Sequence, residues 1–232
     1  MESLFGWMSC TSYQADPHRT LESWKQMVDE MAEYGLNFLS IDFNSDGWYD
    51  PRAWGMDWPA QDPMLRSYCN PGCLNSDERT EYVSQVLDYA RSCGIEHLYL
   101  FVGMYVWRQV MEAHPELQSE FVISENRRIT GGCIDNPEYF GFMKRMVADL
   151  AAYYQGKANG FVVEGPRYNW RPQVGYHEPT RQLFRQENGL DIYEADRDFV
   201  REWKRRRIAG LTAELARVVQ SKGYERFGVH ND

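Results

Sequence analysis

A single carboxylate closes an apolar run in the segment FVVEGPRY, residues 161–168. The apolar residues before Glu164 are typical of a buried β-strand, and Gly165 and Pro166 then turn the chain. Parallel strands of α/β enzymes deliver their catalytic groups at the carboxyl end. Glu164 is therefore a candidate for proton transfer or nucleophilic attack.

Two further carboxylates are expected on the same rim as Glu164. Side chains alternate between the two faces of a strand, and this alternation places Asp42 and Asp232 on the same face as Glu164. We therefore take Glu164, Asp42 and Asp232 as the catalytic candidates. The alternatives are a structural Glu164 paired with an arginine and an Asp42 that only orders its loop.

Two carboxyl groups on one rim suit the hydrolysis of a glycosidic bond. One group protonates the leaving oxygen, and the other acts as nucleophile or as base for water. The two groups lie about 5 to 5.5 Å apart in retaining enzymes and roughly 6.5 to 9.5 Å apart in inverting ones. Arg167, close behind Glu164, could bind the substrate or tune the pKa of the acid.

The chain is rich in aromatic residues, at 15% with 8 Trp and 15 Tyr. Aromatic rings at strand ends can stack on the apolar faces of sugars, whereas the alternative for each ring is packing in the core. The expected substrate-binding residues are those at or just beyond the strand ends, namely Trp7, Tyr105, Trp107, Arg167, Tyr168, His230 and Asn231.

The hydrophobic pattern predicts strands and amphipathic helices that alternate along the chain. The expected strands are residues 4–9, 37–43, 97–103, 160–164 and 226–230, and the expected helices are residues 21–34, 77–92, 137–154 and 196–222. Gly35, Gly94 and Gly223 end three of these helices shortly before a strand. Strict alternation indicates parallel strands joined by right-handed crossovers, and hence an α/β fold.

The strand-to-helix connections, about residues 44–76, 104–136 and 165–195, are much longer than the helix-to-strand turns. Long loops in a compact domain are usually functional, and in α/β barrels this side carries the site, although decorated flavodoxin-like sheets also show such loops. We expect residues 1–232 to form one domain, an incomplete TIM-type (βα)₈ barrel with five strands and four helices. An open five-stranded sheet is the alternative. A second acid could then lie on a strand beyond this sequence.

Charge and composition argue against several partners. The formal net charge of −9 argues against binding to nucleic acid or to anionic lipid. The amino-terminal residues show neither a secretory signal nor a membrane span, which leaves a cytoplasmic or a secreted location open. Oligomeric state has no signature in the sequence.

Metal and cofactor binding have weak support in the sequence. Cys69 and Cys73 in CNPGC could form a zinc half-site or a local disulfide, but no second pair with ligand spacing follows. A metal-dependent hydrolase would place His-x-His at the end of the first strand, where Trp7, Met8 and Ser9 stand. We expect no metal and no cofactor.

Four segments carry a resemblance to a family. They are CIDNPEYFGFMKRMVADL at residues 133–150, NGFVVEGPRY, LFRQENGLDI at residues 183–192 and DFVREWKRRRIAGLTAEL at residues 198–215. In this order they resemble the first half of uncharacterised bacterial glycoside-hydrolase-like (βα)₈ barrels. The acid that ends the fourth strand is Glu164 here, where Asp is frequent in that family. The resemblance implies a glycosidase-type barrel and leaves the role of the acid open.

The sequence thus predicts a glycoside hydrolase that acts on a carbohydrate through a carboxylate pair including Glu164. A non-catalytic carbohydrate-binding barrel is the main alternative, and a metal-dependent hydrolase is a third.

Overall fold

The computed structural model describes residues 6–10, 20–46, 54–69, 77–104, 106–124, 127–166, 168 and 176–230. At its centre is a five-stranded sheet whose strands follow one another in sequence order, β1-β2-β5-β8-β9, and pair in parallel. The strands are β1 (Gly6–Cys10), β2 (Phe38–Asp42), β5 (His97–Gly103), β8 (Gly160–Glu164) and β9 (Arg226–His230).

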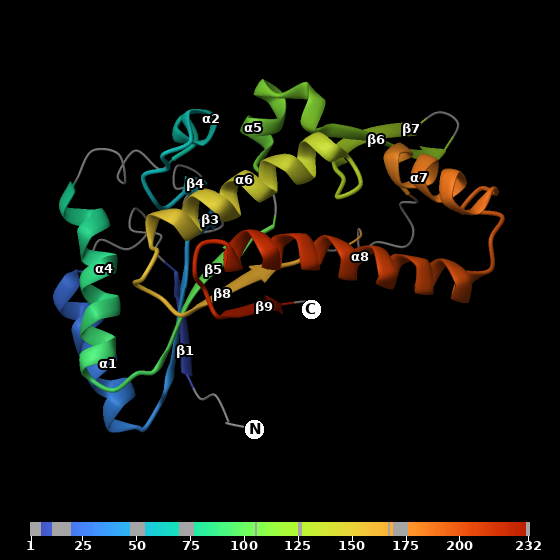
Figure 1. Cartoon of the computed structure of the whole chain (residues 1–232). Coiled ribbons are helices and arrows are strands. Elements are labelled where there is room, and N and C mark those ends of the chain that lie inside the picture. Colours follow the sequence, from blue (N-terminus) through green and yellow to red (C-terminus); the bar gives the residue numbers. More distant parts are fainter. Residues whose placement is uncertain are drawn as a thin grey trace.

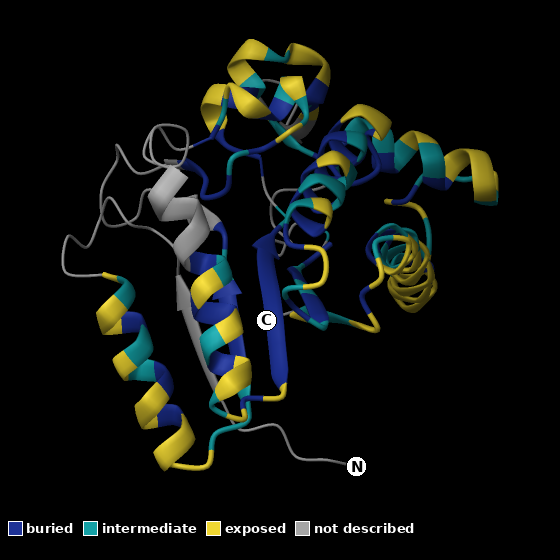
Figure 2. Cartoon of the chain, turned by 60° about the vertical axis from the view of Figure 1, so that its left-hand side comes forward, coloured by how far each residue is buried: buried dark blue, intermediate teal, exposed yellow. Residues whose placement is uncertain are grey.

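Four long helices connect these strands and cover one face of the sheet (Figure 1). They are α1 (Leu21–Glu33), α4 (Asp77–Ser92), α6 (Pro137–Tyr153) and α8 (Arg197–Gln220). Figure 2 shows exposed residues on their outward sides and buried residues toward the sheet. The α/β alternation predicted from the sequence is confirmed, with shifts of one or two residues at several element ends. The sheet does not close on itself within the described residues, so the structure shows a parallel α/β sheet and not a complete barrel.

Local signals define where the helices begin and end. Thr20 accepts a hydrogen bond from the Ser23 amide at 3.2 Å and closes a capping box on α1. Asn136 caps α6 in the same way, since its side-chain oxygen accepts from the Glu138 amide at 3.0 Å. Gly35, with φ of 69°, adopts the left-handed conformation that stops α1 before β2.

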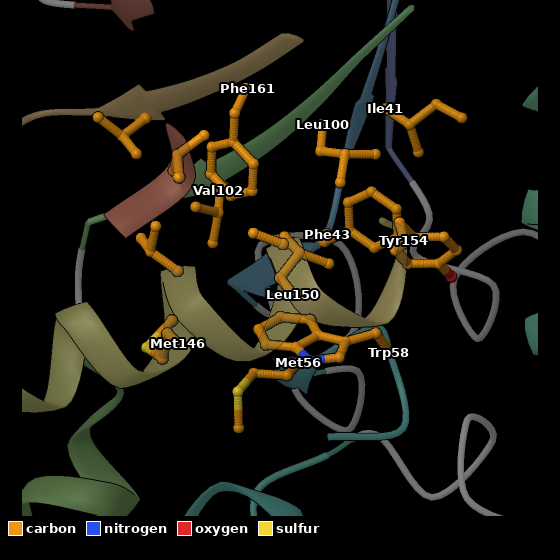
Figure 3. Packing of buried hydrophobic residues seen from close by; sticks show 14 of the residues in the cluster. Ile41, Phe43, Met56, Trp58, Leu100, Val102, Met146, Leu150, Tyr154 and Phe161 are labelled. Atoms are coloured by element: carbon orange, nitrogen blue, oxygen red, sulfur yellow. The ribbon is translucent and has the colours of Figure 1, made fainter. Parts of the chain in front are cut away.

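The core lies between the sheet and the helix layer, and Figure 3 shows the part of it where the sheet meets α6. Ile41, Leu100 and Phe161, from β2, β5 and β8, are fully buried and pack in one cluster with Met146 and Leu150 of α6. Each fully buried side chain of this size contributes about 1.5 to 3 kcal/mol to folding. This packing fixes which strand residues face the helices, and therefore which residues face away from them.

Shorter elements occupy the long strand-to-helix connections. They are β3 (Asn44–Asp46), β4 (Trp54–Met56) and α2 (Pro63–Arg66) after β2, then α5 (Arg108–Ala113), the 3₁₀ turn η1 (Pro115–Leu117), β6 (Gln118–Ser124) and β7 (Arg127–Gly132) after β5, and α7 (Glu178–Asn188) after β8. The sequence pattern did not predict any of them. None of the helices that the structure describes is long and apolar enough to cross a lipid bilayer.

One carboxylate ties the first insertion to the helix layer. Asp149 of α6 accepts hydrogen bonds from the Trp58 indole at 2.8 Å and from the Gln61 and Asp62 amides at 2.9 and 2.7 Å. Trp58 is fully buried, and its ring packs edge-on against Phe43 at 6.5 Å. The segment after β4 is therefore fixed on α6.

Gly160 allows Tyr99 to lie across the face of the sheet opposite the helices. A Cβ at Gly160 would stand 2.3 Å from the Tyr99 ring. We expect Gly160→Ala to destabilise the protein by about 1 to 3 kcal/mol, because the ring must leave its rotamer. Urea denaturation measures the change. In the control, Gly141→Ala in α6, the new Cβ meets nothing within 4 Å, and a gain of up to about 1 kcal/mol is expected. Equal stability of the two variants would contradict the close packing of Tyr99 on Gly160.

Candidate functional site

Glu164 is held at the carboxyl end of the central part of the sheet. It pairs in register with Gly103 of β5 and His230 of β9. The Met104 amide donates to the Glu164 carbonyl at 2.9 Å, and the Gly165 amide donates to the His230 carbonyl at 3.0 Å. Hydrogen bonds from both neighbouring strands therefore position the backbone on which the half-buried Glu164 side chain stands.

Asp42 and His230 share the face of Glu164. Asp42 pairs with Phe101, which pairs with Val162, two residues before Glu164 on the same face. Asp42 thus lies two strand spacings, about 10 Å, across the sheet and one pleat repeat below Glu164. His230 is the direct neighbour of Glu164, and its ring meets that of Phe101 edge-on at 6.1 Å. The predicted placement of Glu164 and Asp42 on one face is confirmed by this register.

Five of the sequence-predicted site residues lie wholly or in part outside the described residues. Trp7 belongs to β1, in register with Leu39, but its side chain is not described. The other four are Tyr105, Arg167, Asn231 and Asp232.

The two remaining aromatic candidates lie against other parts of the fold. Trp107 is 6% exposed and packs in the main hydrophobic cluster. Tyr168 is half-buried, and its ring lies 6.0 Å from that of Trp203 in α8. Tyr168 packs against both hydrophobic clusters, the main one and a smaller one around Phe184 and Trp203. These contacts favour packing for both rings.

A buried polar cluster behind Tyr168 has no counterpart in the sequence analysis. Asp135, whose side chain is fully buried, accepts hydrogen bonds from Arg207 Nε at 2.9 Å and from the Thr180 hydroxyl at 2.8 Å. The Cys133 thiol lies 3.3 Å from the same hydroxyl. Cys133 and Asp135 lie between β7 and α6, Thr180 lies in α7, and Arg207 lies in α8. The cluster therefore joins three separate segments around one carboxylate.

Asp135 affects the pKa values of Tyr168 and Arg207. Burial raises the pKa of Tyr168, and the negative charge of Asp135 raises it further. Burial alone would lower the pKa of Arg207, but its hydrogen bond to Asp135 and the carboxylate charge outweigh this effect and raise the pKa. Tyr168 is thus neutral and Arg207 charged at neutral pH.

The described residues contain no group of three or more His, Cys, Asp or Glu side chains that could hold a metal ion. Cys69 is buried, where its sulfur accepts from the Ala60 amide at 3.4 Å, and burial raises the pKa of this thiol to about 11. Cys69 is thus a packing residue. Cys73, the other half of the CNPGC pair, lies outside the described residues.

Comparison of the fold with solved structures finds glycoside hydrolases. The chain superposes on α-L-fucosidase isoenzyme 2 from Paenibacillus thiaminolyticus with a TM-score of 0.59 at 13% identity, over 91% of this chain and 29% of that one. It superposes on a family 20 catalytic module of the pneumococcal exo-β-D-N-acetylglucosaminidase StrH with a TM-score of 0.56 at 15% identity, over 95% of this chain and 52% of that one. The chain is therefore similar in fold to part of these enzymes and spans about half or less of their length.

A third similar structure has the size of this chain. It is a hypothetical protein from Ruminiclostridium thermocellum, with a TM-score of 0.55 at 12% identity, and the match covers 98% of this chain and 97% of that one. No protein-family model and no curated protein sequence matches the chain. The comparisons together define a glycoside-hydrolase-like α/β fold.

We expect Asp135→Asn to destabilise the protein by about 2 kcal/mol, between the values typical of exposed and of buried ion pairs. The amide removes the charge that Arg207 faces and cannot accept from Arg207 and Thr180 through both of its polar atoms. Chemical denaturation measures the loss. The control is Asp198→Asn, at an exposed ion pair of α8 with Arg201, where a change within about 0.5 kcal/mol is expected. A similar loss in both variants would contradict a special role for Asp135.

We expect the free energy of unfolding to depend on pH because His177, the N-cap residue of α7, is buried. It is 7% exposed, and burial lowers its pKa to about 4. Between about pH 6.5 and 4, the unfolded chain binds a proton at His177 that the folded chain does not, so stability falls as the pH drops through this window. The loss amounts to at most roughly 3 kcal/mol. Denaturation at pH 7 and pH 4.5 should show a smaller pH effect in His177→Gln than in the wild type, and an equal effect would exclude His177 as the source.

Proposed function

We propose that this protein is a glycoside hydrolase that acts on a carbohydrate substrate, with Glu164 as a catalytic carboxyl group. The observation that carries the proposal is the position of Glu164, at the carboxyl end of the interior parallel strand β8 and on the face opposite the helices. In (βα)₈ enzymes this end of the strands carries the site. The similarity in fold to glycoside hydrolases supports the same conclusion.

The five strands are proposed to form part of a (βα)₈ barrel within a single domain of residues 1–232. The same-face positions of Glu164, Asp42 and His230 suit an interior that opens at the carboxyl rim. The proposed substrate-binding residues around this rim are Trp7, Tyr105, Arg167, His230 and Asn231, without Trp107 and Tyr168, whose rings pack in the hydrophobic clusters.

Two routes supply the second catalytic group. Asp42, on the same face, can act as the partner carboxylate, and Asp232 is a further candidate. Alternatively, the substrate itself provides the nucleophile, as in the substrate-assisted families 18 and 20. In that case Glu164 alone supplies general acid catalysis. The similarity in fold to a family 20 module supports testing this second route.

The test is turnover of aryl glycosides, including an aryl β-N-acetylglucosaminide and an aryl α-L-fucoside, by the wild type and by Glu164→Gln. We expect Glu164→Gln to lower kcat by about 100-fold or more on poor leaving groups, because the amide cannot donate the acid proton. The loss should shrink for activated phenols, which leave without protonation. This dependence on the leaving group identifies Glu164 as the acid.

Glu202→Gln in α8 is the matched control, because Glu202 is exposed, pairs with Arg205 and is not one of the proposed site residues. It should keep wild-type kcat. Asp42→Asn and Asp232→Asn together separate the two routes. A loss in either variant comparable with that of Glu164→Gln indicates a carboxylate pair, and wild-type kcat in both indicates substrate assistance. Wild-type activity in Glu164→Gln refutes the proposal. Sugar binding by the wild type without turnover favours the non-catalytic barrel.

A further inference from the structure

A pocket of about 340 Å³ lies between α7 and α8, and none of the proposed catalytic residues lines it. The two helices lie side by side at one end of the molecule (Figure 1). The pocket is lined by Glu187, Asn188, Trp203, Arg206, Arg207 and Gly210. Its volume falls at the lower end of the range for small-molecule sites.

The wall formed by α8 offers positively charged donors. Arg207 uses Nε to hold Asp135 at 2.9 Å, and its other guanidinium nitrogens have no hydrogen-bond partner among the described residues. Arg206 forms no ion pair within the part of the chain that the structure describes. Asp135 pairs with Arg207, whereas no carboxylate of the described residues pairs with Arg206, so the Arg206 guanidinium can pair with a ligand.

The wall formed by α7 offers acceptors. Glu187 Oε2 accepts from the Trp203 indole at 2.6 Å, which fixes the carboxylate at the pocket and leaves Oε1 as an acceptor. Asn188 donates its amide to the Phe184 carbonyl at 2.9 Å, which leaves the Asn188 side-chain oxygen as a second acceptor. The pocket thus has charged donors on one side and acceptors on the other.

We propose that this pocket binds an acidic saccharide, a sugar ring that carries one carboxylate, as in a hexuronate. Its carboxylate pairs with Arg206 and the outer nitrogens of Arg207, and its hydroxyls donate to Glu187 and Asn188. A neutral sugar cannot form a charge-assisted pair with Arg206. Inorganic phosphate has no sugar ring to place hydroxyls at the acceptor wall and meets the charge of Glu187. The pocket matches a ligand with both kinds of group.

The experiment is calorimetric titration of the whole chain with glucuronate, glucose and inorganic phosphate. Glucuronate should bind saturably and at least tenfold more tightly than either of the others. Arg206→Gln should weaken glucuronate binding about tenfold or more, because a charge-assisted hydrogen bond is lost. Arg205→Gln is the control, since the same charge is removed from the neighbouring residue, which pairs with Glu202 and does not line the pocket.

Filling the pocket gives a test that touches none of its hydrogen bonds. A Cβ at Gly210 meets nothing within 4 Å, so Gly210→Leu should fold and abolish glucuronate binding. Gly141→Leu in α6 is the matched control and should bind like the wild type. Thermal unfolding verifies that both variants are folded.

Several results would overturn the proposal. They are absence of saturable glucuronate binding, glucose or phosphate binding as tight as glucuronate, and unchanged binding in Arg206→Gln or in a folded Gly210→Leu. The readout is binding and not hydrolysis, so its outcome is independent of the role of Glu164. Retained glucuronate binding in Glu164→Gln shows that the two sites are separate.

Discussion

The packing of one face of the parallel sheet against α6 is the interaction on which the other features depend. Phe161, Leu100 and Ile41 are fully buried there, and a slip of one residue in any strand would turn them away from the helices. Because such a slip would expose this buried apolar area to water, the packing fixes the register of the strands. With the register fixed, Glu164 and Asp42 must face the opposite side, so their shared face follows from the packing of the core.

The same reasoning explains what could be predicted from the sequence. The strands at residues 97–103, 160–164 and 226–230 were predicted with their observed bounds, because continuous apolar runs and glycine stops are local signals. The insertions were missed for a different reason. The β6–β7 hairpin and α7 are stabilised by contacts with distant segments, although Pro179 and Gly189 did mark the ends of α7. Local propensity alone did not distinguish them from loops.

The cluster around Asp135 could not be predicted from spacing, because Cys133, Thr180 and Arg207 are far apart in sequence and meet only in the folded chain. Tyr168 stands four residues after Glu164 and packs on Trp203. Tyr168 thus anchors the chain that leaves β8 on the helix layer. Trp203, which contacts Tyr168, and Arg207, which contacts Asp135, also line the α7–α8 pocket. The pocket therefore shares these two side chains with the contacts that hold Tyr168 and Asp135.

The long strand-to-helix connections and the short helix-to-strand turns differ in how far their sequences can change during evolution. The β3–β4 and β6–β7 hairpins pair internally and contribute no strand to the central sheet. Both hairpins are also anchored on the scaffold, since Met56 of β4 is buried in the main core and Ser119 of β6 accepts a hydrogen bond from Asn136. The opposite end of the sheet has only tight glycine turns. Exchange of a hairpin therefore leaves the scaffold intact only where the replacement keeps these contacts. The parts of each hairpin that lie away from them are the places where the sequence can change with little cost to folding.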